Sequence, residues 1–182
     1  MGIENCLKAG AVICALAFLP AVSKAQTEVQ VGRCSPTAVS DHSYARSSTR
    51  EATHLLNDMQ YDARQVENHA QVMDNFADHT KFAWNTTGIE LRRIRWEIND
   101  MGKRLCRLET MQNAVPLAEQ QAIHIVAPVV QEMADNADAA IHFRNAHHNG
   151  LWAPSFIANA QNLRTEANTV IRQIHGSAKL AG

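Results

Sequence analysis

Apolar residues recur at alternating steps of four and three along most of this 182-residue chain, and this spacing limits the possible folds more than any other feature. A step that averages about 3.5 residues places the apolar side chains along one face of an α-helix. Such a helix must bury its apolar face against another element. The first stripe consists of Ala52, Leu56, Met59, Ala63, Val66, Ala70, Met73 and Ala77.

Three more segments repeat this stripe, and residues that start, bend or stop helices lie between or within them. Thr87 and Glu90 have the spacing of a capping box, which predicts the start of a second helix. Pro116 suits the first turn of a third helix. Pro128 is expected to kink or split that helix, and Gly176 is expected to stop the fourth. The predicted helices cover residues 49–79, 87–115, 116–149 with a kink near 128, and 154–175.

Four amphipathic helices with short connections pack most economically as an antiparallel up-down four-helix bundle, so we predict an all-α fold. A hydrophobic content of 46% and a charged content of 19% suit one packed core. The first and third predicted helices carry net negative charge, and the second and fourth carry net positive charge. We interpret the arginines of residues 87–115 mainly as partners of an acidic neighbouring helix, with a patch for an anionic partner as the alternative.

Residues 1–25 have the pattern of a signal peptide. A lysine precedes an apolar stretch over residues 9–22, and small residues follow at positions 23 and 25. We therefore expect the mature protein to begin near Gln26 and to be periplasmic or secreted, with an uncleaved anchor as the alternative. The apolar stretch is short for a membrane-spanning helix, so we expect no membrane span after signal cleavage.

Two cysteines, Cys34 and Cys106, remain after the predicted cleavage and predict one disulfide, because an exported chain meets an oxidising compartment. Cys34 lies within residues 26–48, a stretch of poor periodicity that we expect to form an irregular N-terminal arm. In an up-down bundle this arm starts from the end nearest Cys106 and can reach it. The crosslink would stabilise the fold by about 4 kcal/mol. Two unpaired buried thiols are the alternative.

Histidine is unusually frequent, with nine residues in the chain. In an up-down bundle the histidines sort to two poles: His79, His142, His147 and His148 at one, and His54, His124 and His175 at the other. Asp138 lies four residues before His142, which places both on one helical face. We interpret these histidines mainly as surface residues that favour helix C-termini. The alternative is a metal site at the first pole, because converging imidazole and carboxylate groups bind Zn²⁺ or Cu²⁺.

Motifs for other chemistry are missing from the sequence. It contains no Cys-x-x-Cys-His haem motif, phosphate loop, nucleophile elbow or His-Glu-x-x-His. A formal net charge of −1 argues against a nucleic-acid partner. We therefore expect a non-enzymatic protein without a catalytic residue or cofactor, with bound Zn or Cu as the alternative.

The expected function is that of an interaction or structural module of the bacterial envelope or secreted fraction. Its partner is an unknown protein or a second copy, because the small alanines of residues 49–79 allow a close helix approach. A periplasmic metal-binding or metal-sensing bundle is one alternative. A bundle that associates with a membrane surface is another, although the acidic mature chain disfavours it.

Several short segments resemble those of a known group of proteins. They are Ile98-Asn99-Asp100-Met101-Gly102 with Leu105 and Leu108, Pro128, Met133-Ala134-Asp135-Asn136, Ala140-Ile141, and Leu151-Trp152-Ala153-Pro154. In these segments the chain resembles a family of small uncharacterised exported proteins of soil bacteria. The resemblance covers the chain from His69 onward. The resemblance implies an exported helical protein, and it implies no particular activity or ligand.

A metal site at the histidine pole predicts that Zn²⁺ or Cu²⁺ raises the midpoint of thermal unfolding and that EDTA lowers it, because a ligand of the native state stabilises that state. Melts of protein purified without a histidine tag, together with elemental analysis, measure this. The His142→Ala and His148→Ala variants should lose the metal-dependent shift. A protein that contains no stoichiometric metal and shows no shift would contradict the metal site.

Overall fold

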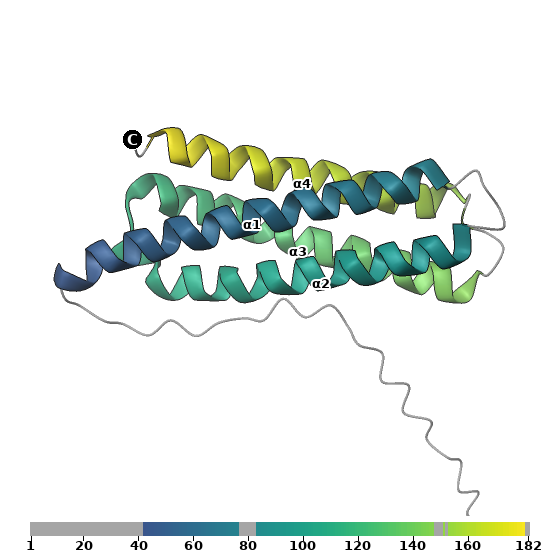
Figure 1. Cartoon of the computed structure of the whole chain (residues 1–182), viewed down its shortest axis with the longest axis horizontal. Coiled ribbons are helices and arrows are strands. Elements are labelled where there is room, and N and C mark those ends of the chain that lie inside the picture. Colours follow the sequence, from purple (N-terminus) through teal and green to yellow (C-terminus); the bar gives the residue numbers. More distant parts are fainter. Residues whose placement is uncertain (1–41, 77–82, 148–150, 152, 181–182) are drawn as a thin grey trace, which may run out of the picture.

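A computed structural model describes residues 42–76, 83–147, 151 and 153–180, and it shows an all-α four-helix bundle. The four long helices lie side by side and run alternately up and down (Figure 1). Within the described residues there is no β-strand. The helices are α1 (His42–Phe76), α2 (Ala83–Met111), α3 (Leu117–Ala146) and α4 (Pro154–Leu180), and a short 3₁₀ helix, η1 (Gln112–Ala114), precedes α3. The predicted fold class is therefore confirmed.

Each helix packs mainly against two neighbours, so the bundle has four seams. The seams join α1 to α2, α2 to α3, α3 to α4, and α4 to α1. Of these, the seam between α2 and α3 has the fewest close approaches. The pairs Glu51–Arg107 and Asp62–Arg104 have rising numbers on α1 and falling numbers on α2, which shows that the two helices are antiparallel.

The predicted apolar stripes form the core. In α1, all the described stripe residues from Ala52 to Met73 are at most 3% exposed. The stripes of α2, α3 and α4 meet them in one hydrophobic cluster, in which Met59, Ile98, Met133 and Leu163 are fully buried. Burial of this apolar surface is the main favourable term in the folding of such a bundle.

The starts of two helices differ from the prediction. α1 begins at His42, so residues 42–48 of the predicted arm are helical. No Gly or Pro occurs in these residues to interrupt the helix. α2 begins at Ala83, which places Thr87 in its second turn with 2% of its surface exposed. The predicted capping box is therefore wrong, and the Glu90 carboxylate instead contacts His69 of α1.

Pro128 and Gly176 do not end the helices that contain them, and the predicted kink at Pro128 stays a prediction. Pro128 lies inside α3, and the helix continues to Ala146 without being split. Its ring lies on the exposed face, where water can satisfy the carbonyl that loses its helical partner. α4 continues through Gly176 to Leu180, so the predicted stop at this glycine is wrong.

Within the residues that the structure describes, no helix is both long enough and apolar enough to cross a membrane.

Gly176 offers a direct test of the fourth helix. A Cβ at this position would meet no atom within 4 Å, so Gly176→Ala adds a methyl group without a clash. Because alanine has less backbone freedom to lose than glycine, we expect the free energy of unfolding to rise by about 0.5–1 kcal/mol. Urea denaturation measures the change. An unchanged or lower stability would show that residues 176–180 are not helical in solution.

Candidate functional site

The predicted metal site does not form among the residues that the structure describes. His79 and His148 lie outside them, so their part in the site stays a prediction. His142 Nδ1 lies 2.8 Å from the backbone oxygen of Asp138, and His147 Nδ1 lies 3.0 Å from that of Phe143. Both rings therefore bond to their own helix, and the His147 ring also stacks on Phe143. In the described part of the chain, no three His, Cys, Asp or Glu side chains could hold a metal ion.

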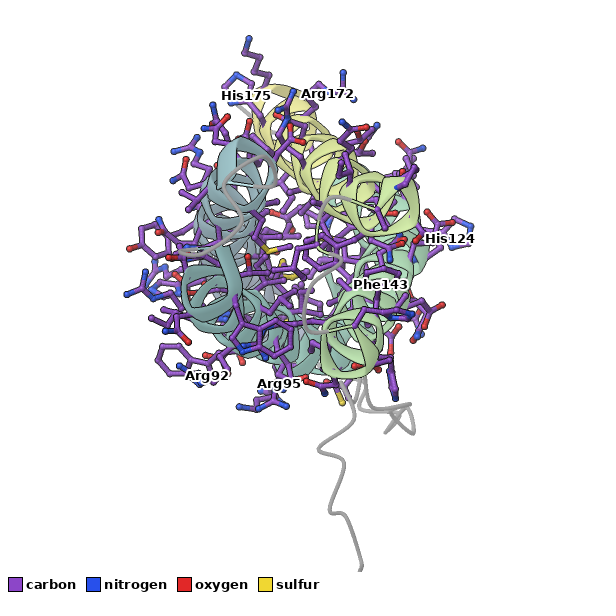
Figure 2. All side chains as sticks on the ribbon, turned by 90° about the vertical axis from the view of Figure 1, so that its right-hand side faces the viewer. Arg92, Arg95, His124, Phe143, Arg172 and His175 are labelled. Carbon is purple, nitrogen blue, oxygen red and sulfur yellow. The ribbon has the colours of Figure 1, made fainter. Side chains whose placement is uncertain are left out.

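The opposite pole shows no gathering of imidazoles either. Figure 2 shows His124 and His175 on different sides of the bundle, each pointing away from the core. His54 is also exposed and lies 3.1 Å from the Asp58 carboxylate, one turn further along α1. Each of these rings therefore belongs to the surface of its own helix.

The structure describes one cysteine of the predicted disulfide. Cys106 is half-buried on α2, in the half of that helix nearest η1. Cys34 lies outside the described residues. The pairing of the two cysteines stays a prediction.

A cluster of charged side chains fills the seam between α1 and α2. The His69 ring lies 2.6 Å from the Glu90 carboxylate, and Arg104 makes a direct ion pair with the buried Asp62. Burial raises the pKa of Asp62 from 3.8 to about 7, although the charge of Arg104 opposes this rise. Burial also raises the pKa of Glu97, which is opposed by His69 and by a hydrogen bond with Asp62. Asp62 therefore changes charge near neutral pH.

A second buried acid lies between α3 and α4. Asn136 Nδ2 donates a hydrogen bond of 2.7 Å to Glu166 Oε1, whereas Glu166 Oε2 is buried and accepts no hydrogen bond from the described residues. Burial and, to a lesser extent, the charge of Glu132 raise the pKa of Glu166 to about 7. Glu166 therefore also changes charge near neutral pH. Its side chain lies in the packed seam between α3 and α4.

Arginines gather at the seam between α2 and α3, where they line a pocket of about 180 Å³ that we call the arginine pocket. Arg92 and Arg95 lie next to each other on α2 (Figure 2), and Arg144 comes from α3. No carboxylate is among the residues that line this pocket, which are Gly88, Leu91, Arg92, Arg95, Ile141, Arg144 and Asn145. Burial, followed by the charge of Arg92, lowers the pKa of Arg144.

Contacts with α2 hold Arg144 in place. Its guanidinium lies 3.8 Å above the Trp84 ring and donates a 3.0 Å hydrogen bond from Nη2 to the Trp84 carbonyl oxygen. It also covers Gly88, where a Cβ would lie only 2.5 Å from Nη2. Glycine therefore leaves the space that the arginine occupies. Trp84 lies within the first turn of α2, before residue 87, where that helix was predicted to start.

A second pocket, of about 340 Å³, lies at the opposite end of the bundle, where α1 and α3 begin and α4 ends. We call it the polar-end pocket because Thr49, Thr53, Glu119 and Ser177 are among the residues that line it. Glu119 is only 5% exposed. Neither pocket shows a linear motif, so neither can be predicted from the sequence.

The pH dependence of stability follows from the raised pKa of Asp62. The folded chain holds more protons than the unfolded chain between about pH 4 and about pH 7, so the free energy of unfolding should fall as the pH rises through this window. Asp62→Asn should make this slope less steep, because asparagine does not titrate, whereas Glu166 still does. Arg104→Gln should extend the slope above pH 7, because the opposing charge is gone. Urea denaturation between about pH 4 and about pH 8 measures both, and parallel curves for all three chains would contradict the assignment.

No protein-family model, no curated protein and no solved structure matches this chain.

Proposed function

We propose that this chain is an exported, non-enzymatic bundle that acts as an interaction module and binds an acidic segment of a partner protein. The observation that carries this proposal is the convergence of Arg92 and Arg144 on the arginine pocket. Two guanidinium groups that face one space repel each other, and Arg92 makes no ion pair in the described part of the chain. A carboxylate between them would relieve the repulsion and accept their hydrogen bonds.

The surface of α2 beside the pocket supports a protein partner. Ile89 is 40% exposed and Trp96 is 66% exposed, and they lie two turns apart on the helix. Arg92 lies between them on the same face, and Arg93 lies at its edge. Tryptophan and arginine are enriched among residues that dominate the energy of protein interfaces. An acidic segment with apolar side chains matches both parts of this surface.

The export of the protein rests on its first 25 residues, and the resemblance to exported proteins of soil bacteria supports it. The same compartment would favour the pairing of Cys34 with Cys106. The acidic mature chain favours a protein partner over an anionic membrane surface.

Binding of a short fluorescein-labelled peptide of Asp, Glu and Leu tests the proposal. Fluorescence anisotropy at low ionic strength should show saturable binding that weakens as salt is added. Arg92→Gln should weaken binding about tenfold, because the peptide carboxylate loses a charged donor. Trp96→Ala should weaken it as well, because the apolar contact is lost.

Matched controls separate the site from general charge attraction. Arg64→Gln removes the same charge from an exposed position of α1 and should leave the affinity unchanged. A peptide with Asn and Gln in place of Asp and Glu should not bind. Equal losses with Arg92→Gln and Arg64→Gln would overturn the proposal, as would stronger binding to anionic phospholipid vesicles than to the acidic peptide.

A further inference from the structure

The polar-end pocket holds a buried carboxylate that is short of hydrogen-bond donors. Glu119 Oε1 accepts a 2.8 Å hydrogen bond from the Thr53 hydroxyl. Glu119 Oε2 is buried and has no partner among the described residues. An unpartnered buried acceptor, and a charged one above all, is costly for the folded chain.

The Thr53 hydroxyl, which is the hydrogen-bond donor to Glu119, also lies close to a second acceptor. The Thr53 hydroxyl also lies 2.9 Å from the backbone oxygen of Thr49, and a hydroxyl has only one proton to donate. The start of α3 favours a negative charge at Glu119, because the amides of a first turn point toward that end of the helix. The Glu119 carboxylate therefore accepts at most one hydrogen bond from the described residues.

The walls around this carboxylate are mostly apolar or neutral. Leu56 of α1 and Ile174 of α4 are buried and form part of the lining, and Ala178 lies on the exposed side. The lining residues include no Lys, Arg or His, so no basic group of the pocket neutralises Glu119. A volume of about 340 Å³ lies at the lower end of the range for small-molecule sites.

We propose that the polar-end pocket binds a small ligand that combines a protonated amine with a short apolar chain. The ammonium group supplies three donors and a positive charge to Glu119, and the apolar chain packs against Leu56 and Ile174. The site lies at the opposite end of the bundle from the arginine pocket. The proposal therefore stands independently of the acidic partner proposed above.

Calorimetric titration of the purified protein with n-hexylamine tests this site. We expect one molecule to bind, and we expect 1-hexanol and hexanoate to bind at least tenfold more weakly, because they lack the ammonium group. Glu119→Gln should weaken hexylamine binding at least tenfold. Glu132→Gln removes an exposed carboxylate from the same helix and should leave the binding unchanged.

A second variant tests the site without a change to the carboxylate. Ala178→Leu adds a larger side chain at an exposed helical position that lines the pocket, so the chain should fold while the available space shrinks. Hexylamine binding should then be lost. The proposal is overturned if hexylamine does not bind the unaltered protein, if 1-hexanol binds equally well, or if both Glu119→Gln and Ala178→Leu leave the affinity unchanged.

Discussion

Burial of the four apolar stripes is the constraint on which the rest of this structure depends. Each stripe covers one face of its helix, and the helices can remove all four faces from water only by turning them toward a shared axis. This requirement fixes the rotation of every helix. Polar residues beside a stripe, such as Asp62, Glu119 and Glu166, are thereby drawn into the seams or ends of the bundle, where partial burial makes an unpaired charge costly.

The partners of the buried polar groups differ from one seam to the next. Between α1 and α2, acids meet His69 and Arg104, whereas between α3 and α4 an amide of Asn136 meets Glu166. The seam between α2 and α3 is packed least closely, and there Arg144 lies over Gly88 beside the arginine pocket. Positive charge without a carboxylate in the lining distinguishes this seam, and the proposed binding of an acidic segment rests on this feature.

Local signals predicted the faces of the helices well and their ends poorly. The stripe positions from Ala52 to Met73 are buried as expected, since each depends on a repeated pattern that tertiary packing reinforces. Thr87 and Glu90 have the spacing of a capping box, but α2 begins four residues before Thr87. The Thr87 side chain is buried instead, and the Glu90 carboxylate contacts His69. A single residue pair is a weaker signal than a period, because a side chain with a tertiary partner no longer needs its local one.

The amino-acid sequence by itself determined the number of helices, their buried faces and their up-down order, because periodicity and short connections are properties of neighbouring residues. Only the tertiary structure decided which polar groups converge. Arg144 reaches the Trp84 carbonyl across 60 residues, and Thr53 reaches Glu119 across 66. The spacing of these residues along the chain does not predict such contacts. They arise from the rotation and offset of packed helices, which the burial of all four stripes sets together.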